Sequence, residues 1–560
     1  MRESRLSDLV AILFTLCISV QGTAQREPKA FASTTDAAAT TLHVESQLVL
    51  VDVVVRHHRE PVKGLIASDF VLLEDGKPQK IAFFEAHEAP RSSASYVKQA
   101  RPPDIFTNDT AEPPPSVNVI LFDTLNTPPS DQPYARKQMI EFLKTLPSGY
   151  HVALFELGAK LRMLAGFSDN SEELVAAAKK LVPHTSPLLQ TDEDLLREQK
   201  EIAKTRMPYN GESVEAMQQF MSATSAAVAQ NRVRLTLQGL NTLTGAMSGF
   251  RGRKNVIWLS EYFPVFFGLM ADSNKFPEVQ RYSDLMRGTS SALSSSQVAL
   301  YPIDIRGLTS GFLGNAALEG KAVDNLSAIQ GIEARHLGMD EIAADTGGHA
   351  YYNTNDLKFA MQRSFESGSE YYTLAYVPPN GTDSKYHRIE IRFSRSGFSG
   401  EHRKGYFAFP IKQSNEGGSE FAAAVRPAAP VLNRLHLKAR LQSPASRHPN
   451  TVVECTISPE DLTFADQPNN RKVVRLNLLT VAWDKYLNTV SQISNTVELQ
   501  FSPEQYVRVL RDGITTRQEM RLTKPGRYDI RTAVMDDANH RIGSLEIPIE
   551  ISSNAKLAKK

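Results

Sequence analysis

The sequence is poor in cysteine and has no excess of either charge. Only two of its 560 residues are cysteines, and 63 lysines and arginines face 62 aspartates and glutamates, a formal net charge of +1. This balance excludes a strongly basic nucleic-acid binder and a strongly acidic tail protein. The 31 glycines and 31 prolines are too few for a collagenous or low-complexity chain. A hydrophobic content of 41% is typical of a chain that folds, and this length suffices for several cores.

The first 24 residues are typical of a secretory signal peptide. Positive residues precede an apolar run at residues 9–20, and small residues stand before a cut at Gln25. The run is short for a bilayer span, and no later stretch is long and apolar enough to be one. We therefore expect export to the periplasm, the cell surface or the extracellular space; a retained membrane anchor is the alternative. Cleavage removes Cys17 and leaves Cys455 alone, which excludes an internal disulfide and favours a buried thiol.

The chain divides into segments by composition and periodicity. Every second residue from Val49 to Val55 is valine, the period of a strand, and Asp75-Gly76 is a strong hairpin turn signal. Stretches rich in proline or in small residues separate the folded parts. We expect, in order, a signal peptide at 1–24, a disordered linker at 25–41, a β segment at 42–98, a proline-rich linker at 99–116, an α/β domain at 117–366, a second β segment at 367–412, a linker at 413–430 and an all-β, immunoglobulin-like sandwich at 431–555.

Strands and helices alternate between residues 117 and 366. Residues 117–122 form a continuous apolar run, as in a strand buried within a parallel sheet, and a helical pattern follows at about 130–146. This alternation predicts a doubly wound α/β domain. The β segments at 42–98 and 367–412 each lack enough apolar residues for a core of their own. We therefore expect them to pair, so that the α/β domain is inserted in one β-sandwich; two separate small sheets are the alternative.

A candidate binding site follows the first strand of the α/β domain. In an open parallel sheet, ligands bind beyond the carboxyl ends of the strands, and Asp123 stands at such an end. Thr127 places a hydroxyl on the same loop, and a carboxylate and a hydroxyl so placed can share a hard cation such as Mg²⁺. In the alternative, Asp123 caps the following helix and holds the loop by hydrogen bonds.

The order of several short motifs resembles a known domain family. The segments Asp123–Thr127, Gly252–Ser260 and Ala344–Gly348 are similar to those of a von Willebrand factor type A domain. Further motifs are similar to recurring segments of a secreted bacterial family, the acidobacterial von Willebrand factor type A-related proteins: Asp69-Phe70, Glu74–Lys77, Leu300–Asp304, Tyr371–Tyr376 and Arg403–Tyr406. The resemblance covers most of the chain that follows the signal peptide, and it implies the same doubly wound fold.

This resemblance implies Mg²⁺ or Mn²⁺ at a metal-ion-dependent adhesion site with a D-x-S-x-S motif. Leu125 stands where the first serine of the motif is expected, so one direct ligand is missing and the site is degenerate. The implied metal ligands are Asp123 for the first aspartate, Asn126 as a substitute amide oxygen, Thr127 for the second serine, Thr185 for the threonine of a second loop and Glu261 for the aspartate of a third.

We therefore expect an exported, non-enzymatic binding or adhesion-type protein. In type A domains an acidic group of the partner completes the coordination of the metal, so the resemblance implies a protein partner that offers a carboxylate; no nucleic acid is expected. One alternative is a structural component of the cell envelope that binds no metal. Another is a hydrolase with Asp123 and Glu261 as paired carboxylates, which requires a deep pocket and a perturbed carboxylate.

Overall fold

The computed structural model describes most of the chain after residue 47. The described residues are 48–58, 60–88, 104–108, 117–146, 150–189, 211–250, 252–261, 277–307, 336–379, 383, 385–408, 417–442, 450–522 and 524–551. All of them belong to one compact unit that spans residues 47–560. The predicted signal peptide at 1–24, the linker at 25–41 and most of the segment at 99–116 lie outside the described residues. Within these ranges no helix combines the length and the apolar character needed to cross a bilayer.

The first β-sandwich is assembled from two parts of the chain that the α/β domain separates. β1 (Val49–His57) pairs antiparallel with β12 (Tyr371–Tyr376), and β3 (Phe70–Glu74) pairs antiparallel with β13 (Tyr386–Phe393). Apolar side chains from both parts share one core. One sheet has the order β14 (Phe398–Glu401), β1, β12 and β5 (Phe83–His87), with β2 (Glu60–Pro61) added to β1, and the other has the order β15 (Gly405–Phe407), β13, β3 and β4 (Lys77–Gln79).

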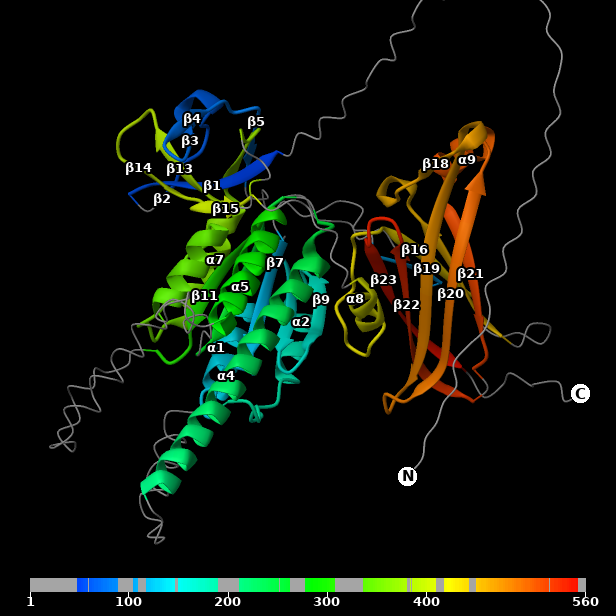
Figure 1. The fold of residues 1–560 in the computed structure, drawn as a ribbon, viewed down its shortest axis with the longest axis horizontal. Helices are drawn as coiled ribbons and strands as arrows, with labels where there is room; N and C mark the ends of the chain where they lie inside the picture. The colour runs from blue at the N-terminus through cyan, green and yellow to red at the C-terminus, as the bar shows by residue number, and fades with distance from the viewer. Residues whose placement is uncertain are drawn as a thin grey trace, which may run out of the picture. The chain divides into compact units, whose positions relative to one another are not determined.

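A five-stranded sheet forms the centre of the α/β domain (Figure 1). The order of its strands is β11 (Val298–Asp304), β10 (Lys254–Ser260), β7 (Val117–Asp123), β8 (His151–Leu157) and β9 (Leu161–Ser168). The first four strands are parallel, and β9 is an antiparallel edge strand. β7, β10 and β11 are buried along their whole length, which explains their largely apolar sequences.

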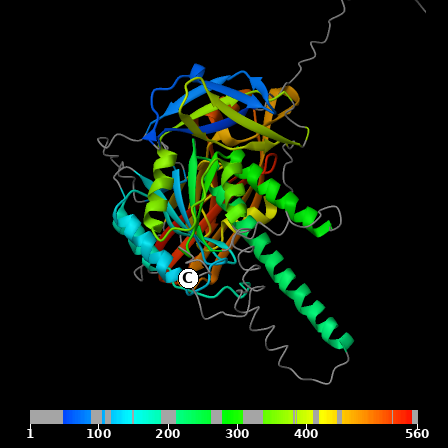
Figure 2. The ribbon, with the colours of Figure 1, turned by 90° about the vertical axis from the view of Figure 1, so that its left-hand side faces the viewer.

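Helices cover both faces of this sheet, as Figure 2 shows. Side chains of α1 (Gln132–Lys144), α2 (Ser171–Lys179) and α7 (Leu357–Ser369) pack on one face. Those of α4 (Gly211–Met247), α5 (Pro277–Ser295) and the helical residues 336–346 pack on the other. This is the doubly wound α/β arrangement that the sequence predicts. The boundary expected at residue 366 falls inside α7, because this helix continues to Ser369 and only Glu370 separates it from β12.

Two further sheets pack around one apolar core in the C-terminal part of the chain. One sheet has the order β21 (Ile514–Met520), β17 (Thr451–Ile457), β16 (Leu437–Gln442) and β6 (Ile105–Thr107), and the other has the order β18 (Ala465–Gln467), β19 (Arg471–Asp484), β22 (Gly526–Asp536) and β23 (Ile542–Ile551), with β20 (Thr489–Phe501) added to β19. A short helix, α9 (Pro503–Asp512), connects β20 to β21. Cys455 is buried in β17, and burial raises the pKa of its thiol to about 12.

Two segments that we expected to be linkers contain regular structure. β6 lies within residues 99–116 and pairs with β16, and α8 (Gly417–Ala424) lies within residues 413–430. Ala424 and Val425 are buried in an apolar cluster. Both elements are too short to be stable alone, and their composition resembles that of a linker. The edge of an existing sheet stabilises β6, and burial of small apolar side chains stabilises α8.

A pair of glycines tests the packing of the α/β domain. A Cβ at Gly348 would stand 1.8 Å from the carbonyl oxygen of Leu300 in β11, whereas a Cβ at Gly288 in α5 would meet nothing within 4 Å. We expect Gly348→Ala to lower the unfolding free energy by about 2–3 kcal/mol, because the backbone must move. Gly288→Ala should raise it by about 0.5–1 kcal/mol, because alanine is the better helix former. Urea denaturation of both variants checks this, and equal effects would contradict the packing described.

A candidate divalent-cation site at the carboxyl ends of the strands

Asp123 is the last residue of β7, and its side chain is completely buried. Its Oδ1 accepts a hydrogen bond from the backbone N–H of Asn126 (2.9 Å). Its Oδ2 accepts three more, from Asn126 Nδ2 (2.8 Å), Trp258 Nε1 (2.9 Å) and Ser260 Oγ (2.9 Å). Trp258 and Ser260 belong to β10, the strand that pairs with β7. The carboxylate therefore fastens the loop after β7 to its neighbouring strand.

The environment of Asp123 differs from that of a helix cap. α1 begins at Gln132 and its N-cap residue is Asp131, so Asp123 does not cap this helix. Asp123 does hold the loop after β7 by hydrogen bonds, as the same alternative also expected. Burial raises the pKa of Asp123 to about 6, and the hydrogen bonds from Asn126 and its other donors limit the rise. Asp123 is thus a hydrogen-bond anchor for the loop.

Leu125 occupies the position where the resemblance expects a serine. Its side chain is 1% exposed and belongs to the core cluster that contains Leu121 and Phe155. Its backbone N–H donates to the carbonyl oxygen of Leu157 (2.9 Å). An apolar side chain turned into the core offers no oxygen to a metal ion, so this position supplies no ligand.

Asn126 and Thr127 carry buried oxygen atoms without a hydrogen-bond partner in the described part of the chain. Asn126 donates through Nδ2 to Asp123 and to Thr236 Oγ1 in α4 (2.9 Å), and its Oδ1 is left unpaired. Thr127 is completely buried, and its Oγ1 is unpaired as well. Buried acceptors without a partner cost free energy unless water or an ion reaches them.

Glu261 follows Ser260 at the end of β10 and contributes a third oxygen of this kind, Oε2. The residue is only 6% exposed. Burial, then a hydrogen bond with Asp131 and the negative charges of Asp131 and Asp304, raise the pKa of Glu261 to about 8, while Arg306 opposes the rise. The carboxyl group is therefore mostly protonated at neutral pH in the absence of a cation.

Thr185 differs from the other expected ligands because its side chain is exposed. Its loop is nevertheless tied to the loop after β7 by the buried side chain of Gln132. Gln132 Nε2 donates to the carbonyl oxygens of Thr127 (2.8 Å) and His184 (2.9 Å), and its Oε1 accepts from the N–H of His184 (3.1 Å). The partners that sequence reasoning missed are Gln132, Thr236, Trp258 and Ser260.

The unpaired oxygens fit a hard divalent cation in part. Amide, hydroxyl and carboxylate oxygens, here from Asn126, Thr127 and Glu261, are the ligands that Mg²⁺ and Mn²⁺ prefer. The fit is incomplete because Leu125 supplies no oxygen and Oδ2 of Asp123 already accepts three hydrogen bonds. Glu261 must also lose its proton before it can serve as a ligand.

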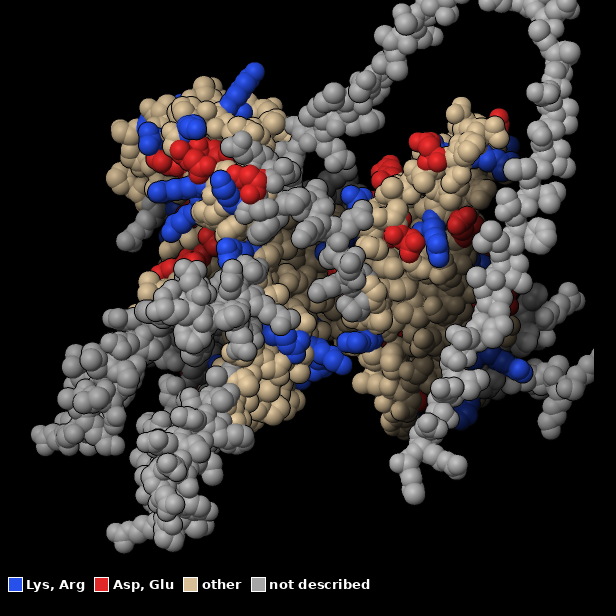
Figure 3. Space-filling view, viewed as in Figure 1, with Lys and Arg blue, Asp and Glu red and all other residues tan. Residues whose placement is uncertain are grey.

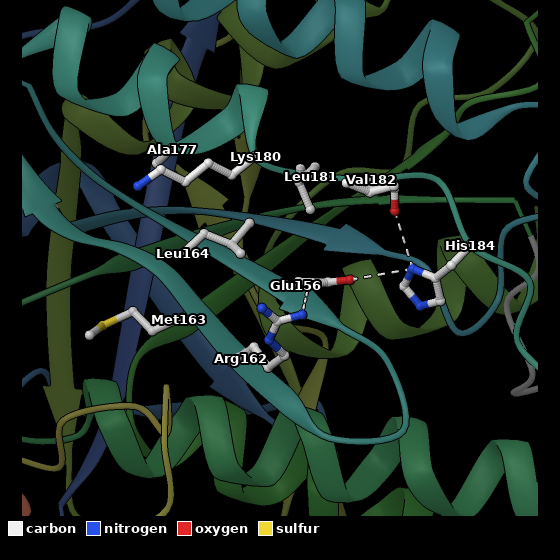
Figure 4. A pocket seen from close by; sticks show the side chains of 9 residues that line it. All are labelled: Glu156, Arg162, Met163, Leu164, Ala177, Lys180, Leu181, Val182 and His184. Carbon is white, nitrogen blue, oxygen red and sulfur yellow. Dashed lines mark hydrogen bonds and ion pairs between the residues drawn. The ribbon is translucent and has the colours of Figure 1, made fainter. Parts of the chain in front are cut away.

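A cavity of about 420 Å³ lies between β8, β9 and α2 (Figure 4). Glu156 points into it, where Arg162 donates to Oε2 (3.0 Å) and Nδ1 of His184 lies 3.8 Å from Oε1. Thr124, next to Asp123, donates to the same Oε1 (3.3 Å). The remaining lining residues are Met163, Leu164, Ala177, Lys180, Leu181 and Val182. This cavity is therefore not lined by the two carboxylates that the hydrolase alternative requires.

No family model and no curated protein matches the chain. Among solved structures, a von Willebrand factor type A protein from Catenulispora acidiphila is 10% identical with a TM-score of 0.23, and the match covers 61% of this chain and 75% of that chain. An aerotolerance-related membrane protein from Bacteroides fragilis is 11% identical with a TM-score of 0.23, over 45% and 98% of the two chains. Three N-terminal domains of the type V pili tip protein Mfa5 from Porphyromonas gingivalis are 8% identical with a TM-score of 0.24, over 84% and 96%. TM-scores this low carry no argument about function.

The anchor role of Asp123 predicts a large loss of stability on its removal. Asp123→Ala removes four hydrogen bonds, from the N–H and the amide of Asn126, the indole of Trp258 and the hydroxyl of Ser260, so we expect the unfolding free energy to fall by about 3 kcal/mol or more. Asp356→Ala is the control, because Asp356 caps α7 through the N–H of Phe359 (2.9 Å) and should cost only about 1 kcal/mol. Urea denaturation measures both; similar losses would contradict the anchor role.

The raised pKa of Glu261 predicts that this residue makes stability fall with rising pH. Between its ordinary value of 4.5 and about 8, the folded chain holds a proton that the unfolded chain has released. The unfolding free energy should therefore fall through this window, by up to about 1.4 kcal/mol per pH unit. Glu261→Gln should lack this contribution. Urea denaturation between pH 5 and 8 in EDTA tests it, and parallel curves for the two proteins would refute it.

Proposed function

We propose that this chain is an exported, non-enzymatic binding protein whose α/β domain meets a protein partner through the loop that follows β7 and through Glu261 at the end of β10. The observation that carries the proposal is the set of three buried, unpaired oxygens on Asn126, Thr127 and Glu261 beside the Asp123 anchor. Unpaired buried acceptors are rare in folded proteins, and they are expected where something from outside the chain completes a site.

Mg²⁺ or Mn²⁺ is the completing ion in this proposal. Asn126, Thr127 and Glu261 would hold it, and Asp123 would support them by keeping Asn126 in place. Thr185 is exposed on a loop that Gln132 ties to Thr127, and in this proposal it would meet the ion or the partner from the solvent side. A bound divalent cation supplies the positive charge at which a carboxylate of the partner completes the coordination.

The state of the two carboxylates favours binding over hydrolysis. Asp123 already accepts four hydrogen bonds, and a general base or nucleophile needs a free lone pair that points at the substrate. Glu261 is protonated at neutral pH unless a cation is bound, so the pair does not offer two ionised carboxylates. Loop anchoring needs neither property, and cation binding needs only Glu261 to lose its proton.

The charge distribution suits a partner recognised at short range. Figure 3 shows acidic and basic side chains intermingled over the first sandwich, in keeping with the net charge of +1. A mixed surface of this kind exerts little long-range attraction, so contacts at the binding surface itself must supply the specificity. Export through the signal-like residues 1–24 is part of the same proposal.

Two buried threonines test whether a cation binds at these loops. Thr127→Val removes an unpaired hydroxyl, so its stability in EDTA should equal or slightly exceed that of the unmodified protein. Mn²⁺ or Mg²⁺ at about 100 times its dissociation constant should stabilise the unmodified protein by about 2.7 kcal/mol and should not stabilise Thr127→Val. Thr451→Val is the matched control, because Thr451 in β17 is also buried with an unpaired Oγ1 and should keep the full response.

A peptide array tests the acidic partner. Mn²⁺-dependent binding of the mature protein should be confined to peptides with aspartate or glutamate, and it should vanish when these become asparagine or glutamine. Thr127→Val should abolish it and Thr451→Val should not. If no cation stabilises the unmodified protein, the metal-assisted hypothesis is wrong, and the domain serves as a metal-free interaction scaffold.

A further inference from the structure

A second cluster of metal-ligating side chains lies in the first sandwich, on elements separate from the Asp123 loops. Glu74 ends β3, Asp75 occupies the turn between β3 and β4, and His387 lies on β13, which pairs with β3. One ligand atom from each of the three residues lies within 4.8 Å of the other two. Nδ1 of His387 is 2.8 Å from Asp75 Oδ2 and 3.6 Å from Glu74 Oε1.

The backbone of the turn explains why Asp75 faces His387. Asp75 has a φ of 49° and Gly76 has a φ of 78°, the left-handed conformation that a two-residue hairpin turn requires. The N–H of Arg388 donates to Asp75 Oδ1 (2.9 Å), and the N–H of Asp75 donates to the carbonyl oxygen of Arg388 (2.9 Å). The turn is thereby fixed against β13, and Oδ2 is left to point at the imidazole.

Each of the three side chains also makes a hydrogen bond to a residue outside the cluster. Glu74 Oε2 accepts from the hydroxyl of Tyr406 (3.3 Å), Asp75 Oδ1 accepts from Arg388 as described, and Nε2 of His387 lies 2.9 Å from Asp383 Oδ1. The ring of His387 also stacks on Tyr406, with ring centroids 5.4 Å apart. Histidines that ligate a metal usually donate their other ring nitrogen to a carboxylate in this way, which fixes the ring and its tautomer.

Two residues of the cluster are buried, and the third is exposed to solvent. Glu74 is 2% exposed and His387 is 4% exposed, whereas Asp75 is exposed and leaves a path from the solvent. The hydroxyl of Tyr376 is also buried, and it interacts with the carboxylate of Glu74. A buried carboxylate such as that of Glu74 is costly unless a positive charge compensates it, and a bound cation would supply that charge.

We propose that Glu74 Oε1, Asp75 Oδ2 and His387 Nδ1 form a binding site for a divalent transition-metal ion, with Zn²⁺ as the best match. One imidazole nitrogen and two carboxylate oxygens are a donor set that Zn²⁺ accepts, with solvent in the remaining position. The ion takes the place of the proton shared by His387 Nδ1 and Asp75. It joins the β3–β4 turn to β13 and thereby fastens the two parts of the chain that make the sandwich.

Zn²⁺ binding to the mature protein tests the proposal. We expect one tight Zn²⁺ by competition with a chromophoric chelator, and a 10- to 100-fold weaker affinity in His387→Gln and in Glu74→Gln. Asp383→Asn should weaken binding about tenfold, because it removes the contact that orients the imidazole. His436→Gln is the matched control, since Nδ1 of His436 also lies 2.8 Å from a carboxylate oxygen, Asp461 Oδ2, but His436 is not part of the cluster; this variant should bind Zn²⁺ as the unmodified protein does.

The absorption spectrum of bound Co²⁺ tests the site in the unmodified protein, so the test also works if His387→Gln fails to fold. Co²⁺ added to the unmodified protein should produce the visible absorption of an imidazole-ligated ion, and Zn²⁺ should remove it. Thr127→Val should leave this signal unchanged, which separates the site from the one at Asp123. The proposal is wrong if the unmodified protein binds no Zn²⁺, or if His387→Gln and Asp383→Asn bind Zn²⁺ as tightly as the unmodified protein does. In that case His387 only makes hydrogen bonds to the neighbouring carboxylates.

Discussion

The carboxyl end of the α/β sheet depends on one buried carboxylate. Asp123 gathers two donors from Asn126 and one each from Trp258 and Ser260, which stand far along the chain. A carboxylate without any exposure is tolerated because these donors replace the water that it has lost. Since the amide nitrogen of Asn126 serves Asp123 and Thr236, its oxygen must face another way. The unpaired oxygen of Asn126 therefore follows from the position of this one anchor.

Sequence reasoning succeeded where the signal is contiguous. The alternating valines at 49–55 predicted β1, and the apolar run at 117–122 predicted β7 with Asp123 at its end. The hydrogen-bond donors that β10 offers to Asp123 could not be predicted, because they depend on which strand lies beside β7. Strand order is decided by the packing of helices from distant parts of the chain, and a single sequence does not display it.

Short elements and side-chain orientations set a second limit on what the sequence predicts. β6 has three residues and no readable period, and its conformation comes from the edge of β16. Leu125 was recognised as a missing ligand, but only the packing of its side chain into the core shows that no local adjustment restores an oxygen there. The exposure of Thr185 and the link through Gln132 likewise depend on tertiary contacts between two loops.

The divided first sandwich has a consequence for synthesis of the protein. Val49 pairs with Tyr376, so β1 leaves the ribosome long before its partner exists. At about 5–20 residues per second, roughly 15 to 65 s pass before β12 emerges. During that interval the valine-rich part of β1 lacks its partners β12 and β14, and only Arg56 and His57 can pair, with β2; this composition and exposure favour aggregation. Chaperone binding, or rapid folding of the inserted α/β domain, would keep β1 available for its partner during this interval.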